Sequence, residues 1–367
     1  MSITAIVKPT HDCNLSCSYC YVEEGAEKGK MSSTTLEKMI EQLGKVNHGR
    51  RSSIIWHGGE PLKMPREFYE YARYVEYWVS KKEDTKFDNS VQSNGTLLTE
   101  EWADFLRESH FSIGFSLDGP EKINNLTRKY PNGKGAYNEI VRGIKTGIKY
   151  GIGGGFIVVL NKNNITHLDE IYNFVKEMGV GAKINPLIHS GKGFKNLDNL
   201  AITPKEYGNA MKFLFDKYFY DKDFERGLDP FDVLIGNVSV GNPEGCCSFS
   251  KSCQENFISV GPLGDVYPCG RFDGVKNFWM GNVNNVELSD SIKGEVRKNL
   301  LKRKLERMSE CSPCEHNKIC NGGCMSNGYM RNGDFMDKDY YCAGYKSLFN
   351  HIGKAIDKEL AKAEVKA

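Results

Sequence analysis

The chain has 367 residues, of which 49 are basic, 47 are acidic and 40% are hydrophobic, a composition ordinary for a globular protein. Its formal net charge of +2 argues against a nucleic-acid partner, which requires a strongly basic surface. No apolar run approaches the roughly 18 residues that cross a bilayer, and Met1–Thr10 does not have the pattern of a signal peptide, so we expect a cytoplasmic protein with no membrane partner.

Strand-like segments alternate with helical ones up to about residue 230. The predicted strands are Ser2–Lys8, Ser53–Trp56, Asn89–Ser93, Ser112–Leu117, Gly155–Leu160 and Gly181–Pro186. The predicted helices are Ser33–Lys45, Phe68–Lys81, Glu100–Glu108, Ala136–Tyr150 and His167–Met178. This alternation predicts right-handed crossovers and a mostly parallel sheet. We therefore expect an α/β protein with a partial (β/α)6 barrel, whose chemistry lies at the carboxyl ends of the strands.

The composition changes near residue 230. Cysteines, glycines and turn residues follow, until a terminal helix predicted at about Lys346–Lys362. Small regions without a sizeable apolar core are usually held by metal or cluster ligation. We therefore predict a barrel domain over residues 1–230 and a small cysteine-rich domain over 231–367. The basic stretch Lys293–Arg307 is interpreted as a helix with a solvated charged face.

The twelve cysteines are unevenly placed. Three lie within Cys13–Cys20, none lies between Cys20 and Cys246, and nine fall in the last third of the chain. In a reducing cytosol, metal or cluster ligation explains cysteines better than disulfides do. A disulfide framework would rarely leave so long a gap, so this placement favours ligation.

The first three cysteines, Cys13, Cys17 and Cys20, are spaced C-x3-C-x2-C directly after the first predicted strand. A zinc site usually takes four ligands, and His11 is the candidate for a fourth. Three thiolates in a tight loop instead suit a cubane iron–sulfur cluster that leaves one iron without a protein ligand. A small molecule can chelate that iron.

Three further segments follow predicted strands: Gly58-Gly59-Glu60-Pro61, Gln92-Ser93-Asn94-Gly95 and Ser116-Leu117-Asp118-Gly119-Pro120. Glycines in the first let the backbone approach a ligand closely, and an acceptor there can bind an ammonium group. A plain β-turn is the alternative for that segment. A turn with Gly119 and Pro120 is a sufficient explanation of Asp118.

Together, these segments resemble the radical S-adenosylmethionine (SAM) superfamily. The resemblance implies that the first three cysteines hold a catalytic [4Fe–4S] cluster, which cleaves SAM to a 5′-deoxyadenosyl radical. It implies that the first segment binds the SAM ammonium group, the second lies near the ribose, and Ser116 and Arg128 contact the carboxylate, with Arg142 as the alternative arginine. The full implied SAM pocket is Tyr19, Gly58, Gly59, Glu60, Pro61, Gln92, Ser93, Asn94, Ser116, Arg128 and Leu160. Tyr19 is expected to lie over the adenine, and Leu160 to pack there or in the core.

The C-terminal cysteines resemble the SPASM module of peptide-modifying radical SAM enzymes, which binds two auxiliary clusters with crossed ligation. By that resemblance, the first auxiliary set is Cys247, Cys253, Cys269 and Cys324, and the second is Cys311, Cys314, Cys320 and Cys342. Two structural zinc sites are the alternative. Cys246 is left over, as a spare thiol or an alternate ligand.

The resemblance implies a radical SAM enzyme with three [4Fe–4S] clusters and an electron donor of flavodoxin or ferredoxin type. We predict that it oxidises a peptide or protein side chain, as in the crosslinking or dehydrogenation of ribosomally made peptides. The alternative is an anaerobic sulfatase maturase, which oxidises Cys or Ser to formylglycine. Maturases usually carry an acidic residue directly after the third cysteine of the first auxiliary set, and an aromatic two residues past the last core cysteine. This chain has Gly270 and Val22 at those positions.

Two other classes of protein remain as alternatives, a non-enzymatic iron–sulfur scaffold or electron carrier and a SPASM dehydrogenase of a sugar or alcohol. The candidates for a base or radical partner are Asp273, Tyr21, His57 and His189. Each is expected to face the cavity from a strand end or a cluster loop. A structural role is the alternative for each histidine and tyrosine.

Overall fold

A curved sheet of ten strands forms the centre of the computed structural model, in the order β10-β9-β8-β1-β2-β3-β4-β5-β6-β7. The structure describes residues 2–22, 26, 29–241, 245–304 and 308–365. The first six strands are β1 (Thr4–Val7), β2 (Arg51–Trp56), β3 (Lys86–Ser93), β4 (Phe111–Ser116), β5 (Gly153–Leu160) and β6 (Ala182–Pro186). They pair in parallel, neighbour to neighbour. The six predicted strands and their parallel order are therefore confirmed.

Four short strands extend the sheet beyond this parallel core. They are β7 (Leu228–Asp229), β8 (Phe257–Val260), β9 (Asp265–Tyr267) and β10 (Gly281–Asn282). β7 pairs in parallel with β6, whereas β8 pairs in parallel with β1. β9 and β10 continue antiparallel from β8. The pairing of β8 with β1 places the cysteine-rich part of the chain beside the strand that leads into the first cysteine loop.

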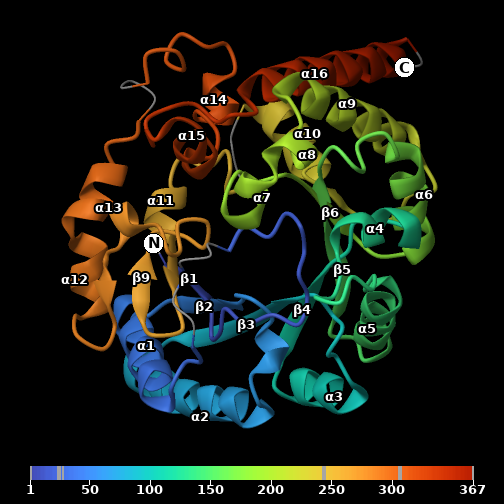
Figure 1. The fold of residues 1–367 in the computed structure, drawn as a ribbon. Helices are drawn as coiled ribbons and strands as arrows, with labels where there is room; N and C mark the ends of the chain where they lie inside the picture. The colour runs from blue at the N-terminus through green and yellow to red at the C-terminus, as the bar shows by residue number, and fades with distance from the viewer. Residues whose placement is uncertain (1, 23–25, 27–28, 242–244, 305–307, 366–367) are drawn as a thin grey trace.

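Helices cover the outer side of the sheet (Figure 1). The helices of the first two thirds are α1 (Ser33–Val46), η1 (Pro61–Lys63), α2 (Arg66–Glu83), α3 (Glu100–Glu108), α4 (Glu121–Thr127), α5 (Tyr137–Lys149), α6 (Leu168–Met178), α7 (Gly191–Lys195), α8 (Leu197–Leu200), α9 (Pro204–Tyr220) and α10 (Phe231–Val240). In α1, the buried Leu36, Met39, Ile40 and Leu43 recur at helical spacing. The Ser32 side chain caps this helix by accepting a hydrogen bond from Thr35 N. The five predicted helices are confirmed.

The C-terminal part is built from short helices and one long one. They are α11 (Cys253–Asn256), η2 (Lys276–Phe278), α12 (Leu288–Lys293), α13 (Glu295–Leu300), α14 (Asn317–Cys320), α15 (Met325–Asn332) and α16 (Cys342–Glu364). The long helix α16 packs against α9 and α10, and Figure 1 shows it running across one end of the molecule. The predicted terminal helix is confirmed, and it begins four residues earlier, at Cys342.

The prediction of one solvated helix over Lys293–Arg307 is wrong. Gly294 separates α12 from α13, and residues 305–307 lie outside the described residues. Arg297 is only 2% exposed, and its guanidinium donates hydrogen bonds to the carbonyls of Gln254 and Phe257. The charge pattern was misleading because two of its cations, Arg297 and Arg303, are buried in the fold and donate hydrogen bonds to backbone carbonyls.

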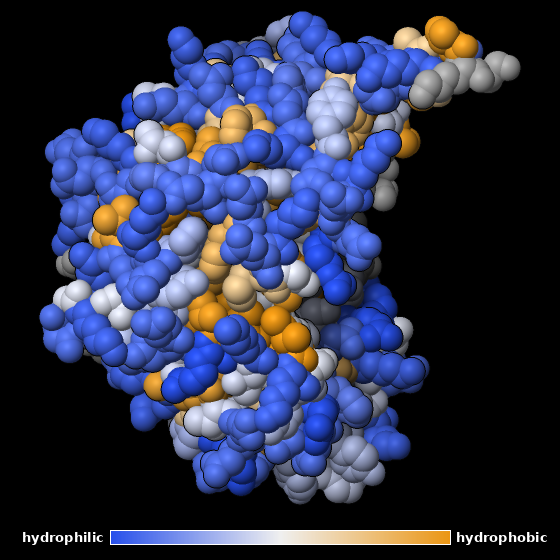
Figure 2. All heavy atoms as spheres, turned by 90° about the vertical axis from the view of Figure 1, so that its right-hand side faces the viewer, coloured by the Kyte–Doolittle hydropathy of each residue, from blue (hydrophilic) through white to orange (hydrophobic). Residues whose placement is uncertain are grey.

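The face shown in Figure 2 is mainly hydrophilic, with hydrophobic side chains in a broken central band. No helix among the described residues is long and apolar enough to cross a bilayer.

Candidate active site

The loop that carries the first three cysteines lies between β1 and α1, and hydrogen bonds hold it from two sides. Its Ser16 and Ser18 amides donate hydrogen bonds to the carbonyls of Lys129 and Thr127, at 2.7 and 3.0 Å. On the other side, Lys192 Nζ donates to Ser16 Oγ at 2.9 Å. Residues after α4 and after β6 therefore hold this loop at the carboxyl ends of the strands, where the barrel prediction placed the chemistry.

The three core thiols lie together. Burial, together with the neighbouring thiols, raises the pKa of Cys13 to about 12 and that of Cys17 to about 11. Leu15 N and Asn94 Nδ2 approach Cys13 Sγ at 3.4 and 3.7 Å as donors. Grouped thiolates repel one another unless a cation lies among them, and the iron of a cluster supplies that charge. This donor set therefore fits the predicted catalytic cluster.

The loop after β2 lies directly against the chain that enters the cysteine loop. Gly58 has a φ of +118°, and a Cβ atom there would lie 2.3 Å from the Thr10 carbonyl oxygen. A Cβ on Gly59 would lie 2.3 Å from the carbonyl oxygen of Asp12. The two glycines are needed because two backbone segments meet here. Hydrogen bonds from Gly59 N to Thr10 O and from Glu60 N to Asp12 O join the segments.

Glu60 is fully buried and links two of the predicted SAM segments. Its carboxylate accepts hydrogen bonds from Ser93 Oγ at 2.7 Å, Asn94 N at 2.8 Å and Leu62 N at 3.0 Å. Burial raises its pKa to about 7, against the effect of these donors. Because protein donors use both carboxylate oxygens, we expect backbone carbonyls of this loop to bind the SAM ammonium group.

Gln92 and Ser116 connect the next two strands and stay partly exposed. Gln92 Nε2 donates to the Phe115 carbonyl at 2.9 Å and to Ser116 Oγ at 3.2 Å. The Ser18 hydroxyl, in the cysteine loop, is a buried polar atom with no partner in the part of the chain that the structure describes. The polar ends of β3 and β4 and this unpaired hydroxyl fit a bound polar cofactor.

Asp118 is the centre of a buried polar network, so its interpretation as a simple turn residue is wrong. It accepts hydrogen bonds from Tyr19 Oη at 2.5 Å, from Thr127 Oγ1 and Arg128 Nε at 3.0 Å, and from Val159 N at 3.0 Å. The Arg128 guanidinium also lies 5.2 Å from the centre of the Tyr19 ring. Asp118 therefore fixes two predicted SAM-pocket side chains beside the cysteine loop.

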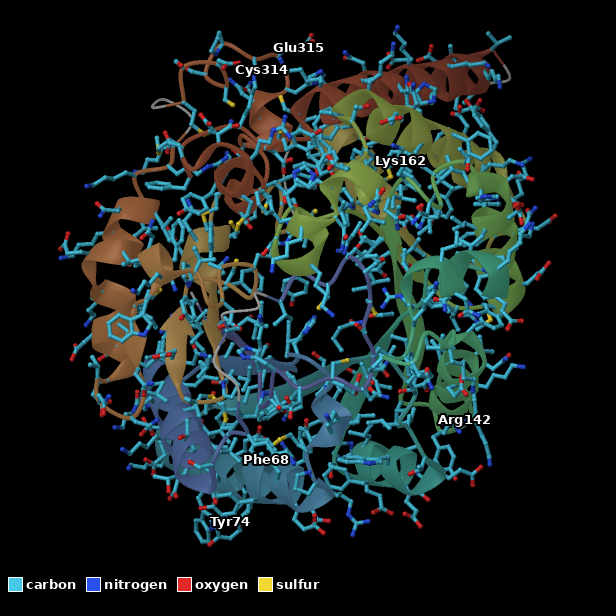
Figure 3. The ribbon with its side chains drawn as sticks, in the orientation of Figure 1. Phe68, Tyr74, Arg142, Lys162, Cys314 and Glu315 are labelled. Atoms are coloured by element: carbon cyan, nitrogen blue, oxygen red, sulfur yellow. The ribbon has the colours of Figure 1, made fainter. Side chains whose placement is uncertain are left out.

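The two candidate arginines lie in different places. Arg128 is 6% exposed, next to Tyr19 and Asp118. Arg142 is on α5, donates to the Thr96 carbonyl at 2.6 Å, and lies at the outer side of the molecule in Figure 3. Arg128 therefore stays the predicted carboxylate ligand. Leu160 is fully buried, at the end of β5.

A second buried cluster joins the N-terminal segment to the cysteine-rich part of the chain. Asp273 Oδ2 is 2.7 Å from Lys8 Nζ and 2.8 Å from His11 Nε2, and all three side chains are nearly inaccessible. Lys8 Nζ also donates to the Gly270 carbonyl at 3.0 Å and lies 5.1 Å from the centre of the Tyr21 ring. Burial alone would raise the pKa of Asp273, but the charge of Lys8 and the hydrogen bond from His11 lower it to about 2.

Tyr21 and His57 lie at the edge of this cluster. Their rings meet edge to face with centres 5.9 Å apart, and Tyr21 Oη is 3.5 Å from His57 Nδ1. Gly58 N donates to the same nitrogen at 2.8 Å. Burial and the charge of Lys8 lower the pKa of His57 to about 4, so His57 is neutral at physiological pH. Three of the four candidate catalytic residues, Asp273, Tyr21 and His57, are thus brought together.

His189 is placed differently from the other three candidates. Its ring packs against Tyr340 and Tyr341, with centres at 4.6 and 6.2 Å. Its Nε2 is buried without a hydrogen-bond partner among the described residues. Burial and the charge of Arg331 lower its pKa to about 4. His189 therefore belongs to the contact between the barrel and the C-terminal part.

The first predicted auxiliary set also comes together. The Cys253 thiol interacts electrostatically with Cys324, Cys269 and Cys247, and burial with these neighbours raises its pKa. Burial raises the pKa of Cys269 to about 11. None of the cysteines forms a disulfide. These four mutually interacting thiols provide the donor set of a cluster with full protein ligation.

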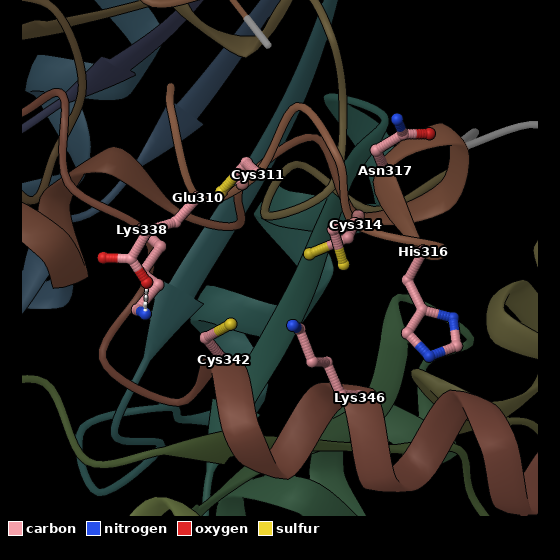
Figure 4. A pocket seen from close by; sticks show the side chains of 10 residues that line it. Glu310, Cys311, Cys314, His316, Asn317, Lys338, Cys342 and Lys346 are labelled. Atoms are coloured by element: carbon pink, nitrogen blue, oxygen red, sulfur yellow. Dashed lines mark hydrogen bonds and ion pairs between the residues drawn. The ribbon is translucent and has the colours of Figure 1, made fainter.

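The second predicted auxiliary set lines a small pocket near the surface (Figure 4). The pocket contains all four of its cysteines, Cys311, Cys314, Cys320 and Cys342. Figure 4 shows Cys314, Cys342 and Lys346 pointing into the same space, and Figure 3 places Cys314 near one end of the molecule. Glu310 and Lys338 form an ion pair at its rim.

The Cys246 thiol lies beside Cys247, whose charge interaction with it is larger than those of Lys183 and Asp229. Cys246 is 8% exposed, and its thiol interacts with Lys183 and Asp229, which are themselves ion-paired. Cys247, the next residue, interacts with Cys253 and Cys269. The interaction of Cys253 and Cys269 with Cys247 agrees with Cys246 as the spare thiol.

Comparison with known proteins accounts for these arrangements. The model of the radical SAM superfamily matches residues 7–175, and that of SPASM, an iron–sulfur cluster-binding domain, matches residues 247–315. The serine-type anaerobic sulfatase-maturating enzyme of Bacteroides thetaiotaomicron is 30% identical, over 99% of this chain and 93% of that protein. The chain belongs to the radical SAM superfamily. It is a radical SAM enzyme of the group that carries a SPASM domain.

Three other comparisons extend over nearly the whole of this radical SAM enzyme. The cysteine-type anaerobic sulfatase-maturating enzyme of Clostridium perfringens is 28% identical over 95% of this chain and 96% of that protein. A solved structure of anSMEcpe with bound AdoMet and the Cp18Cys peptide aligns with a TM-score of 0.85 and 27% identity, covering each chain completely. SuiB of Streptococcus suis, solved with its precursor peptide SuiA, shares the fold with a TM-score of 0.65 and 16% identity, over 93% of this chain and 76% of that one.

Sequence reasoning missed three residues of this radical SAM enzyme that the structure places at the site. Lys8 lies in the predicted first strand, and the only indication of its role was its charge in an otherwise apolar segment. Arg271 lies two residues after Cys269, and this proximity in the sequence was the only indication of its role. Asp118 was noticed but assigned only to a turn. The domain boundary at residue 230 stays a prediction.

We expect replacement of Cys247 by alanine to remove about four irons per chain, the content of one cubane cluster. Replacement of Cys246 by alanine is the matched control and should leave the iron content unchanged, because Cys253 and Cys269 interact with the Cys247 thiol. Iron and acid-labile sulfide after anaerobic reconstitution measure both. The opposite pattern would show that the ligand is Cys246.

We expect replacement of Glu60 by alanine to lower the free energy of unfolding by about 2–3 kcal/mol, because buried donors on Leu62, Ser93 and Asn94 lose their acceptor. The pH dependence follows from its pKa of about 7, raised from 4.5. Between these values the folded chain binds a proton that the unfolded chain has released, so stability decreases as the pH rises through this window. Urea unfolding below and above the window should show a smaller decrease in Glu60→Gln. If stability fell equally with pH in Glu60→Gln and in the natural protein, Glu60 would not be the group that causes this pH dependence.

Proposed function

We propose that this radical SAM enzyme oxidises a Cys or Ser side chain of a peptide or protein substrate to formylglycine. The observation that carries the proposal is the buried Lys8–His11–Asp273 cluster, which joins the segment before the core cysteine loop to the turn after Cys269. The relatives named above as cysteine-type and serine-type sulfatase-maturating enzymes, similar over almost the full chain, support the same reaction. We assign the SAM pocket and the three cysteine sets to SAM and three [4Fe–4S] clusters.

The reaction removes one hydrogen atom, one electron and one proton from the substrate. When bound, SAM and its cluster supply a 5′-deoxyadenosyl radical that takes the hydrogen atom from Cβ, and the auxiliary clusters accept the electron. A serine then becomes the aldehyde directly as its hydroxyl proton leaves. A cysteine becomes a thioaldehyde as its thiol proton leaves, and water converts that to the aldehyde with release of hydrogen sulfide.

We assign the proton to the Asp273–His11 pair. Asp273 is ionised at neutral pH, because Lys8 and His11 lower its pKa to about 2. A weak base suffices, since loss of the electron makes the substrate O–H or S–H strongly acidic. Tyr21 and the neutral His57 lie beside this pair.

The structure offers a physical reason why glycine is tolerated at position 270. A turn, closed by the hydrogen bond from Phe272 N to the Cys269 carbonyl, returns the chain so that Asp273 reaches the cluster. Lys8 Nζ binds both the Gly270 carbonyl and the Asp273 carboxylate. A carboxylate three residues further along can therefore serve in place of an acid directly after Cys269.

The test uses the Cp18Cys peptide and two counterparts with Ser or Ala at the modified position. Each is incubated anaerobically with reconstituted enzyme, SAM and a reductant, then analysed by mass spectrometry and by hydrazide labelling of aldehydes. We expect an aldehyde from the Cys or the Ser peptide, none from the Ala peptide, and 5′-deoxyadenosine in equal amount to the product. Formation of 5′-deoxyadenosine without an aldehyde from either peptide would contradict the proposal.

Peptide crosslinking is the second candidate function, favoured by Gly270 and Val22 at the two positions that depart from the maturase pattern. It predicts loss of two hydrogens with no hydrazide-reactive product. The same mass spectra therefore separate the two reactions.

A further inference from the structure

One cation lies directly on the first auxiliary cysteine set. Arg271 Nη1 donates a hydrogen bond to Cys324 Sγ at 3.2 Å and another to Asn327 Oδ1 at 3.2 Å. Its charge also interacts with the thiols of Cys247 and Cys269. The guanidinium thus touches one predicted ligand of this set and lies near two more.

A second buried carboxylate fixes the orientation of this contact. Asp339 Oδ2 accepts hydrogen bonds from Cys324 N and from Asn327 Nδ2, both at 2.9 Å. Asn327 is therefore held with its Oδ1 toward Arg271. Because Asp339 is 1% exposed, this network is anchored in the protein interior, and the guanidinium stays on the sulfur.

An arginine in this position has a defined electrostatic effect on a cluster. It keeps its charge under all physiological conditions, and each electron that enters a cluster makes the cluster more negative. A nearby positive charge therefore stabilises the reduced state, and a hydrogen bond to a ligand sulfur acts in the same direction. Both effects raise the reduction potential.

We infer that Arg271 is a positioning residue that raises the reduction potential of the cluster held by Cys247, Cys253, Cys269 and Cys324. This makes that cluster the first acceptor of the electron that the substrate loses, an assignment that rests on the proposed function. Lys8 and Asp273 support it, because Asp273 lies two residues from Arg271 and Lys8 Nζ contacts both the Gly270 carbonyl and the Asp273 carboxylate. Proton and electron acceptors then occupy one turn of the chain.

The second auxiliary set offers a matched control. Lys346 points into the pocket lined by Cys311, Cys314, Cys320 and Cys342 (Figure 4). Its charge acts on that set, so a change at Lys346 should affect the other auxiliary cluster.

The experiment is a redox titration of the substrate-free holoenzyme, followed by the electron paramagnetic resonance of its clusters. We compare the natural protein with Arg271→Met, Arg271→Lys and Lys346→Met, each checked for iron content. We expect Arg271→Met to move one cluster to lower potential, Arg271→Lys to move the same cluster less, and Lys346→Met to move a different one. If Arg271→Met does not retain its iron, the test rests on Arg271→Lys, in which the same cluster should still show a smaller decrease in reduction potential.

Two results would overturn the inference. The first is that none of the three cluster reduction potentials changes in an Arg271 variant that retains its iron. The second is a shift of the same cluster by Arg271→Met and Lys346→Met, because the effect would then not be local to the first set. Since the titration contains no peptide, it stands whether or not the aldehyde is formed.

Discussion

Replacement of Asp273 by asparagine is expected to lower the rate of peptide oxidation by about 100- to 10,000-fold, the range for loss of a general base. The amide keeps the size of the side chain but cannot take the substrate proton. It also leaves Lys8 with no anionic partner in this cluster, since the ion pair to Asp273 is lost. SAM cleavage without peptide product should continue, because the core cysteine loop is unchanged.

The measurement compares the amounts of 5′-deoxyadenosine and oxidised peptide formed in the same reaction. The control is Asp357→Asn, an exposed aspartate on α16, which should keep the natural ratio. If Asp273→Asn lowers both products equally, the residue acts on the core cluster or the fold and not as the base. A normal rate of peptide oxidation would contradict its role altogether.

Replacement of Asp118 by alanine is expected to lower the free energy of unfolding by about 3–5 kcal/mol, the cost of leaving one partner of a buried ion pair alone. Arg128 is 6% exposed and its guanidinium contacts both Asp118 oxygens. Tyr19 and Thr127 lose their acceptor as well. The segment that holds the cysteine loop should therefore loosen together with the predicted SAM pocket.

Urea unfolding of the metal-free protein measures this loss without involving the clusters. The control is Asp88→Ala, which removes an exposed partner of Arg51 and should cost less than about 1 kcal/mol. A loss of similar size in both variants would show that Asp118 is not a structural centre. Asp118→Asn should fall between the two, since it keeps the shape but loses the charge.

The parallel sheet could be predicted because its signals are local. Each strand is a short apolar run followed by a polar segment, as in Gly155–Leu160, and each long helix has buried residues at helical spacing. The short elements of the C-terminal part could not be predicted in this way. Helices of four to eight residues such as α13 and α15 show too few turns for a periodic pattern, and side-chain and cysteine contacts fix them.

The core of the candidate site depends on contacts that no local pattern contains. Lys8 and Asp273 are joined because β8 pairs with β1, which brings the start of the chain beside its cysteine-rich part. Tyr19 and Asp118 are 99 positions apart, and the Asp118-Gly119-Pro120 sequence is already explained by a turn. Cysteine spacing was informative because ligands of one cluster recur at intervals that the sequence displays, whereas the partners of a buried charge do not.

The most direct test of the account is the iron and acid-labile sulfide content per chain after anaerobic reconstitution. Three cubane clusters predict about twelve irons with an equal amount of sulfide. About four irons together with bound zinc would contradict the two auxiliary clusters. The C-terminal cysteine sets would then be structural zinc sites, and no auxiliary cluster would be present to accept the electron of the substrate.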